Sequence, residues 1–376
     1  MIKYWQYLDD YERDRQDILA AVDRVFSSGR LILGGEVERF ERDFAAYCGT
    51  DHAVGVNSGT DALFLALKVL DIGRGDEVIT VANTAVPTIA AIRAAGAIPV
   101  FVDVEEDTSL MDARLVEAAV TKRTRCILPV HLFGQMADMD PLRKAAKRHK
   151  LRIVEDCAQA AGATYHGAKA GSFSDIAAFS FYPTKVLGGF GDGGMAVTKS
   201  RKYGERLRRL RFYGMADGQH AEEEGYNSRL DEVHAALLDQ KLSSLDDAVR
   251  RRRLLAAAYT DLLAGIGDIG LPSVRPGREH QFYVYTIRTK RRDRLQQFLL
   301  RRGIETRINY PTPVHRMRAY RSLGYLKGSL PVTERLAAGI LSLPLYPALS
   351  RDDAARCAAA IKDFFDSSGS RNRAGR

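Results

Sequence analysis

The stretch AVGVNSGTDALFLALKVL, residues 53–70, sets the pattern that decides the fold. It begins with a short apolar run typical of a strand, continues through a small polar loop and ends in a helical pattern. The same order repeats along the chain to residue 156. The apolar runs are nearly continuous in Val, Ile and Leu, which is typical of strands buried on both faces. The pattern therefore predicts an α/β fold with a mostly parallel sheet covered by helices.

The expected elements alternate between strand and helix over this part of the chain. Strands are expected at 53–56, 77–81, 98–104, 125–130 and 151–156, and helices at 60–70, 86–96, 113–120 and 141–150. Right-handed crossovers bring the carboxyl ends of such strands to one edge of the sheet. Ligands of open α/β sheets bind at that edge, so a site is expected among the loops that follow the strands.

The alternation of strand-like and helical segments ends at about residue 245. A long helical pattern leads through a Pro- and Gly-rich link to an alternating strand at 282–289 and a further helix. Together with the length of 376 residues, this change predicts a large domain at 1–245 and a smaller α+β domain at 246–366. The polar tail at 367–376 is expected to be disordered.

The chain carries a net charge of +9, from 56 Lys and Arg against 47 Asp and Glu. This excess keeps a nucleic-acid-binding protein as an alternative, but no helix-turn-helix, zinc-finger or aromatic–basic sheet motif accompanies it. Part of the charge lies in the C-terminal tail, and part lies on helical faces such as 199–211. No nucleic-acid partner is therefore expected.

The N-terminal sequence and the cysteines point to an ordinary intracellular protein. The first residues lack the apolar core of a signal peptide, and no uncharged apolar run reaches the ~18–20 residues of a membrane helix. A cytoplasmic location without a membrane partner is expected. The four cysteines are widely spaced and form no Cys/His cluster, so reduced, buried thiols and no metal are expected.

The loop Asn57-Ser58-Gly59-Thr60 lies at the start of the first expected helix. Free backbone amides and the positive end of the helix dipole favour a phosphate at such a place. Simple N-capping of the helix by Ser58 or Thr60 is the alternative.

Two acids, Glu155 and Asp156, end the strand expected at 151–156. Adjacent strand side chains point to opposite faces, so only one of the two can face a given site. A carboxylate at a buried ligand edge needs a partner that compensates its desolvation. Two solvated turn acids are the alternative.

The stretch IAAFSFYPTKVLGGFGDGGMAV, residues 176–197, joins an apolar strand, Lys185 in a turn, a glycine cluster and a second strand-like run. Residues 189–194 match G-x-G-x-x-G. A dinucleotide-binding motif has to open a helix, and because a strand follows here, that interpretation is rejected. A glycine-rich loop beside a lysine is instead expected to let the backbone approach a flat ligand closely.

Taken in order, these segments resemble the sugar aminotransferases of the DegT/DnrJ/EryC1/StrS family, fold type I enzymes that use pyridoxal 5'-phosphate (PLP). The resemblance covers roughly residues 10–365. It rests on NSGTDAL, FVDV, LPVHLFGQMADMD, IVEDCAQAAGA, AFSFYPTK, GGFGDGG, GYNSRLDEVHAA, INYPTPVH and LSLPLYP. Among these, HLFGQ, NSRLDE and YPTPVH are most similar to members that aminate 3-keto-6-deoxy sugars on a nucleotide diphosphate.

The resemblance implies roles for residues around the cofactor. Lys185 would form a Schiff base with PLP and shuttle a proton. Asp156 would pair with the pyridine nitrogen and keep it protonated. The other implied cofactor contacts are Gly59, Thr60, Gln159, Ser180 and Asn227. Asn227 would reach the phosphate of the neighbouring subunit, which implies a homodimer with shared active sites.

The implied reaction moves an amino group from glutamate, or glutamine, to a nucleotide-linked keto-sugar, most closely C3 of a dTDP-3-keto-6-deoxyhexose. The candidates for the substrate pocket are His131, Arg229, Tyr310 and His315. For His131, a satisfied structural histidine is the alternative. Amination at C4, or of a cyclitol ketone, is the alternative activity.

One residue departs from the family pattern. Many members place an aromatic side chain against the cofactor ring where this chain has Ala85, in ANTAVPT. No stacking residue is therefore assigned. Dehydratases of the same family replace the Schiff-base lysine with histidine, so the presence of Lys185 argues against that activity.

Overall fold

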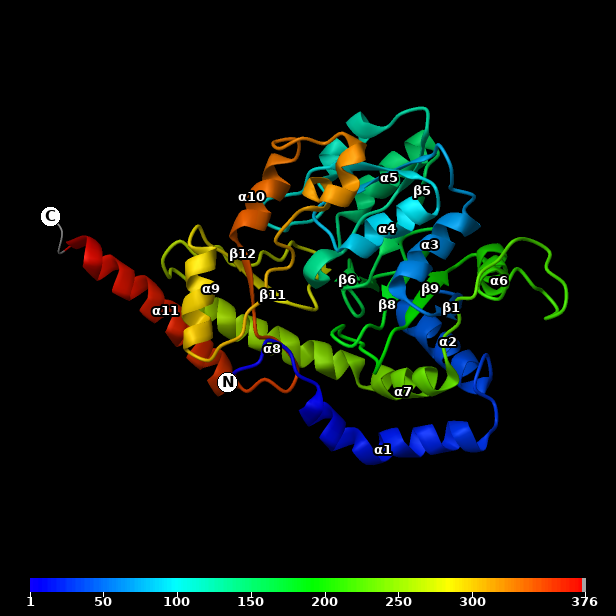
Figure 1. The fold of residues 1–376 in the computed structure, drawn as a ribbon, viewed down its shortest axis with the longest axis horizontal. Helices are drawn as coiled ribbons and strands as arrows, with labels where there is room; N and C mark the ends of the chain where they lie inside the picture. Colours follow the sequence, from blue (N-terminus) through cyan, green and yellow to red (C-terminus); the bar gives the residue numbers. More distant parts are fainter. Residues whose placement is uncertain (374–376) are drawn as a thin grey trace.

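A seven-stranded sheet of order β1-β9-β8-β5-β4-β2-β3 forms the centre of the molecule (Figure 1). The computed structural model describes residues 1–373, with side chains up to residue 367. The strands of the sheet are β1 (His52–Val56), β2 (Glu77–Val81), β3 (Ile98–Val102), β4 (Thr124–Ile127), β5 (Arg152–Asp156), β8 (Ile176–Ser180) and β9 (Gly194–Thr198). All pairs are parallel except those of β9 with β1 and β8. The expected mostly parallel α/β sheet is confirmed.

Two smaller sheets accompany the central one. The first contains β6 (Thr164–Tyr165), β7 (Ala168–Lys169) and β10 (Arg278–Glu279), and the second contains β11 (Tyr285–Arg288) and β12 (Ile340–Leu343). The strand expected at 282–289 is thus present as β11 but is shorter. Phe282 has a φ of 51°, so the backbone cannot continue as a strand through that residue.

Helices surround the central sheet, and others pack on the smaller β11–β12 pair. The α-helices of the described residues are α1 (Leu8–Ser27), α2 (Gly35–Cys48), α3 (Gly59–Val69), α4 (Val86–Ala94), α5 (Met139–His149), α6 (Arg201–Leu210), α7 (Glu232–Ser243), α8 (Leu245–Leu263), α9 (Arg292–Arg301), α10 (Pro331–Gly339) and α11 (Arg351–Arg373). α2 packs on β1 and α7, and α3 packs on β8 and β9. Every residue of β2 and β9 is buried, as expected for strands in the interior of a covered sheet.

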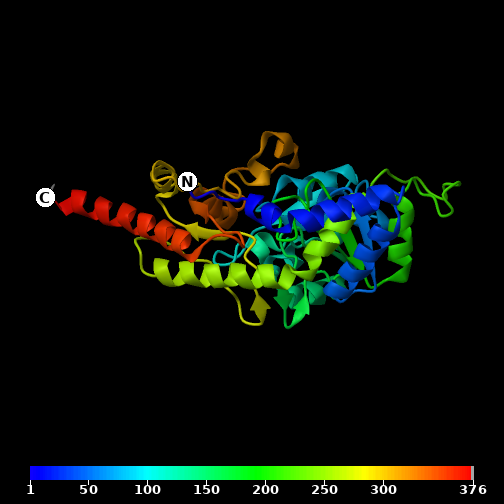
Figure 2. The same cartoon turned by 90° about the horizontal axis from the view of Figure 1, so that it is seen from below.

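The described residues form two large hydrophobic cores and a small cluster between α1 and α7. The larger core surrounds the central sheet, and the smaller one joins α8, α9, α11 and the β11–β12 pair. α8 runs from one to the other, with Leu245 in the larger core and Leu255 in the smaller (Figure 2). Ile2 belongs to the smaller core, whereas Val314 and Leu336 belong to the larger. The domain division at 245/246 stays a prediction.

Some expected elements differ in the structure. The helix expected at 113–120 is wrong, because two short 3₁₀ turns, Ala113–Leu115 and Glu117–Ala119, replace it. The Thr121 amide bonds the Thr124 hydroxyl at 2.8 Å, and this turn into β4 ends the helical run.

At the C-terminus, α11 continues to Arg373 through most of the segment expected to be disordered. The rest of that expectation concerns residues 374–376, which lie outside the described residues. No helix in the described part of the chain is both long and apolar enough to cross a membrane.

Candidate active site

Asp156 lies at the carboxyl end of β5, in the interior. Its Oδ2 accepts a hydrogen bond from the Thr88 hydroxyl at 2.8 Å, and its Oδ1 accepts one from the Ala158 amide at 3.1 Å. Burial raises the pKa of Asp156, although these two bonds and the charge of Lys185 act in the opposite direction. The carboxylate is therefore incompletely compensated, and an additional cationic partner would stabilise it.

Glu155 points the other way, as the strand alternation predicts. Its side chain and that of His131 are both 0% exposed, and His131 Nε2 lies 2.9 Å from Glu155 Oε2. Ser174 and the backbone of Gly171 and Phe173 donate further hydrogen bonds to this carboxylate. Burial alone would raise the pKa of Glu155, but the bonds from His131 and its other donors outweigh burial and lower it.

Both ring nitrogens of His131 are occupied, because Nδ1 accepts the Ala137 amide at 3.1 Å. This geometry supports the alternative of a satisfied structural histidine and gives no support to a place in the sugar pocket. Cys157 lies close by, and its ligand atom is within 4.8 Å of those of His131 and Glu155. Burial raises the pKa of Cys157 well above its ordinary value, so the thiol stays protonated and is a poor metal ligand. All four cysteines are free and buried, as expected.

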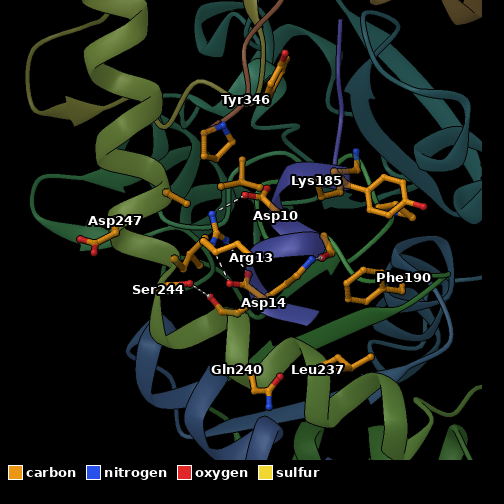
Figure 3. Close-up of a pocket in the computed structure, with 18 of the residues that line it drawn as sticks. Asp10, Arg13, Asp14, Lys185, Phe190, Leu237, Gln240, Ser244, Asp247 and Tyr346 are labelled. Carbon is orange, nitrogen blue, oxygen red and sulfur yellow. Dashed lines mark hydrogen bonds and ion pairs between the residues drawn. The ribbon is translucent and has the colours of Figure 1, made fainter. Parts of the chain in front are cut away.

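Lys185 lies in the turn that follows β8. Its Nζ is 4.7 Å from the centre of the Tyr283 ring, and Tyr283 is held by a 3.0 Å hydroxyl contact with Thr184. The side chain borders a cavity of about 470 Å³ that Tyr7 and Phe190 also line (Figure 3). A lysine beside an aromatic face and a cavity is held in place and remains within reach of a ligand.

The start of α3 lies against the end of β8. Ser58 caps the helix by accepting the Asp61 amide at 3.1 Å, so the capping given as the alternative does occur. The amides of Gly59 and Thr60 belong to the first turn, which has no intrahelical acceptors. A Cβ on Gly59 would lie only 2.6 Å from the Cβ of Ser180. Glycine therefore lets the Ser180 hydroxyl and the amino end of a helix share one small cradle, which suits a phosphate.

Gln159 connects the end of β5 with the C-terminal part of the chain. Its Oε1 accepts the Phe133 amide at 2.8 Å, and its Nε2 donates to the Tyr310 hydroxyl at 3.1 Å. Burial, followed by the nearby Tyr283, raises the pKa of Tyr310, so its hydroxyl stays protonated. Tyr310 is thus placed beside the group that contains Asp156 and Gln159, as expected for a pocket residue.

The other expected residues lie farther out. Asn227 is exposed, but the hydroxyl of its neighbour Ser228 lies 3.4 Å from Asn57, at the loop before α3. Arg229 stacks over the rings of Phe212 and Tyr213, with its guanidinium 5.4 and 5.7 Å from their centres.

His315 is buried, and its Nε2 lies 3.0 Å from Glu334. Its Nδ1 is buried without a partner among the described residues. Within the described part of the chain, the hydrogen bonds, ion pairs and ring contacts of Arg229 and His315 do not include Lys185 or Asp156.

Two residues of the site escaped the sequence analysis. Thr88, which donates to Asp156, stands in ANTAVPT just after β2, and its place at the ligand edge is a signal that could have found it. Tyr283, whose ring contacts the Lys185 amine, lies just before a strand of the smaller core. No motif in the sequence around it indicates a place in the site. Ala85 is half-buried at the N-cap of α4.

Protein atoms fill the space beside the glycine-rich loop before β9. A Cβ on Gly188 would overlap the backbone of its own turn, one on Gly189 would overlap His234, and one on Gly194 would overlap the backbone of Ser58. The expected close approach of a flat ligand is therefore wrong at these three glycines. They are needed for packing of the chain on itself.

The assembled residues fit PLP chemically. Lys185 supplies an amine, Asp156 an incompletely compensated carboxylate, and the cradle of Gly59, Thr60 and Ser180 supplies amides and a hydroxyl for a phosphate. They meet where β8 and β5 end and α3 begins, at the edge of the sheet expected to bind ligands.

Known proteins are similar to this chain along almost its whole length. The model of the DegT/DnrJ/EryC1/StrS aminotransferase family matches residues 12–362. The dTDP-3-amino-3,4,6-trideoxy-alpha-D-glucose transaminase of Micromonospora megalomicea subsp. nigra is 53% identical over 96% of this chain and 97% of that protein.

Two solved structures are similar along the chain. DesV of S. venezuelae, solved with a ketimine intermediate, has a TM-score of 0.96 and 50% identity, over 97% of this chain and 98% of that one. NtdA from Bacillus subtilis, with bound PMP, has a TM-score of 0.86 and 29% identity, over 93% of this chain and 82% of that one. The expected fold type I architecture is confirmed. This chain belongs to the DegT/DnrJ/EryC1/StrS aminotransferase family and is a PLP-dependent aminotransferase.

Proposed function

We propose that this chain transfers the amino group of glutamate to C3 of a dTDP-linked 3-keto-6-deoxyhexose. The observation that carries the proposal is the convergence of Lys185, Asp156 and the start of α3 at one edge of the sheet. The choice of C3 is supported by the relative from Micromonospora, whose name describes a 3-amino sugar linked to dTDP.

Each group of the site has a separate role in this reaction. Bound PLP supplies an electron sink for the carbon that carries the amino group. Lys185 takes and returns the proton at that carbon, because its amine lies beside the Tyr283 ring and close enough to Asp156 for its charge to lower the pKa of that carboxyl. Asp156 holds a positive charge on the ring nitrogen and gains the cationic partner that its burial calls for. Gly59, Thr60 and Ser180 hold the phosphate.

Gln159 and Tyr310 complete one wall of the site. Their hydrogen bond joins the end of β5 to the segment after residue 306 and places the Tyr310 hydroxyl near the reacting groups. We assign Tyr310 to the pocket for the sugar and the donor. Arg229 and His315 remain weaker candidates, because each is held by other protein groups.

We further propose a homodimer in which Asn227 serves the neighbouring subunit's phosphate. Asn227 is exposed, yet its loop is hydrogen-bonded to the loop that opens the chain's own phosphate cradle. An exposed amide at the rim of one site is available to a second copy. The expected cytoplasmic location stays a prediction.

The decisive experiment offers the enzyme a panel of nucleotide-linked 3-keto and 4-keto sugars with glutamate, and identifies the product by NMR. We expect amination of the 3-keto-6-deoxy substrate at C3. Turnover of only 4-keto sugars, or of a cyclitol ketone, would replace the proposed substrate with one of these alternatives. Glutamine in place of glutamate tests the donor in the same assay.

A further inference from the structure

Two residues of α7 form hydrogen bonds with the glycine-rich loop at residues 188–193. His234 Nε2 accepts a hydrogen bond from the Phe190 amide at 3.2 Å, and Lys241 Nζ donates one to the Gly188 carbonyl at 2.8 Å. The Lys241 amine also lies 4.3 Å from the centre of the Phe190 ring. The loop is thus fixed to α7 on both sides of Gly189.

The same loop is tied from inside to the strand that precedes Lys185. The Gly189 amide donates to the Phe181 carbonyl, and the Phe181 amide donates to the Gly193 carbonyl, each at 2.8 Å. Lys185 therefore extends from a closed turn of backbone. Because glycine has more conformational freedom than other residues, the groups that immobilise this turn determine how firmly Lys185 is placed.

The imidazole of His234 fits the glycine pattern. A Cβ on Gly189 would overlap the ring nitrogen that accepts the Phe190 amide, and one on Gly193 would lie 3.4 Å from the ring carbon Cε1. The ring occupies the volume that a side chain at Gly189 would fill. Gly189 and the histidine of α7 therefore form one packing unit.

We propose that His234 is a positioning residue for Lys185. It accepts the Phe190 amide, fills the hollow over Gly189, and so fixes the turn from which Lys185 reaches the cavity in Figure 3. The inference rests on the proposed role of Lys185 as the cofactor-binding lysine.

The protonation state of His234 is consistent with this role, since only a neutral ring accepts the amide. Burial lowers the pKa of His234, and the charge of Lys241 acts in the same direction. A hydrogen bond with the Asp192 backbone and the charges of Asp231 and Asp192 favour the charged form and so raise the pKa of His234, but they do not outweigh burial. The acceptor is therefore present at neutral pH.

A matched pair of variants tests the hydrogen bond. His234→Leu removes the acceptor, whereas the amide oxygen of His234→Gln can replace it. In the apoenzyme, hydrogen exchange of residues 188–193 should become roughly tenfold faster in His234→Leu and stay close to wild type in His234→Gln. In the holoenzyme, kcat should fall in His234→Leu without a matching rise in the KM for glutamate. Unchanged exchange and unchanged kcat in His234→Leu would overturn the inference.

A double-mutant cycle tests the packing, even if one variant is less stable. Gly189→Ala alone should speed exchange in the loop, because its Cβ overlaps His234. In the background of His234→Ala the same change should add little, because the ring is gone. Additive effects would show that the two residues act independently and would contradict the inference. Urea unfolding of each variant separates loosening of the loop from loss of the fold.

Borohydride reduction separates this inference from the proposed function. A covalent label on a lysine other than Lys185 would refute the proposed role of Lys185 whatever the His234 variants do. A label on Lys185, together with wild-type behaviour of His234→Leu, would refute only the positioning role of His234.

Discussion

Glu155 and Asp156 are neighbours in sequence, and both are buried, but their pKa values shift in opposite directions. Glu155 is surrounded by donors that lower its pKa, and His131 completes the set. Asp156 accepts hydrogen bonds from Thr88 and Ala158 and is stabilised by the charge of Lys185, but burial still raises its pKa. The first acid is satisfied by the fold alone. The second keeps a capacity for one more positive partner, which a protonated ring nitrogen would supply.

Asp156→Asn should therefore retain PLP but slow the glutamate half-reaction by orders of magnitude, because an amide cannot hold the ring nitrogen protonated. Stopped-flow absorbance of the cofactor measures this rate. As a control, Thr88→Val removes one hydrogen bond to Asp156 and should cost only about tenfold. Equal rates in Asp156→Asn and wild type would refute the role given to the carboxylate.

Glu155→Gln should lower the free energy of unfolding by about 3 kcal/mol at pH 7, because it breaks a buried pair with His131. The folded pKa of Glu155 lies below its ordinary value of about 4.3, so its contribution exists above that pH and is lost as the pH falls through the folded pKa. The difference between variant and wild type should accordingly shrink in acid.

Urea unfolding at several pH values measures this difference. Glu117→Gln is the matched control, since its partner Arg148 is exposed and such surface pairs contribute at most ~1 kcal/mol. A loss in Glu155→Gln no greater than in the control would contradict the interpretation.

At the scale of elements, the start of α3 combines a cap with a ligand cradle. Ser58 satisfies one amide of the first turn, and Gly59 brings the rest of that turn against Ser180. Capping and phosphate binding were set against each other as alternatives in the sequence. The structure makes them compatible, because the side chain of Ser58 and the backbone after it use different groups.

Gly59→Ala should weaken binding of PLP to the apoenzyme about tenfold or more, because the added Cβ separates α3 from Ser180 and misplaces the amides. Fluorescence titration with PLP measures the Kd. Gly35→Ala is the matched control: Gly35 also opens a helix, but its Cβ would meet nothing within 4 Å. An unchanged Kd in Gly59→Ala would remove this cradle from the proposed site.

The sequence predicted most of the central sheet because its strands are mainly apolar runs, and the bounds predicted for β2 match the structure residue for residue. The helix predicted at 113–120 is wrong. Its residues favour a helix, but the turn that leads the chain into β4 replaces it with two 3₁₀ turns. Lys185 and Asp156 stand out in sequence because unusual neighbours surround them. The contact of Tyr283 with Lys185 joins residues far apart in the chain, and no local pattern encodes it.

At the scale of the whole molecule, shared sites predict complementation between subunits. Lys185→Ala mixed with Asn227→Ala should regain part of the activity, because one site of each mixed dimer then has intact residues from both chains. Lys185→Ala mixed with Asp156→Asn is the control. Both of these residues serve their own chain's site, so no mixed dimer has an intact site. Rescue in neither mixture, with subunit exchange verified, would count against a role of Asn227 across the interface.

The interleaved cores also restrict the order in which the chain can fold during its synthesis. Val314 and Leu336 complete the core around the central sheet, whereas Ile2, which precedes both along the chain, joins the other core. The larger core therefore lacks part of its cover until Leu336 has left the ribosome. Ile2, in turn, cannot form its bridge until Ile304, more than three hundred residues later, has been made.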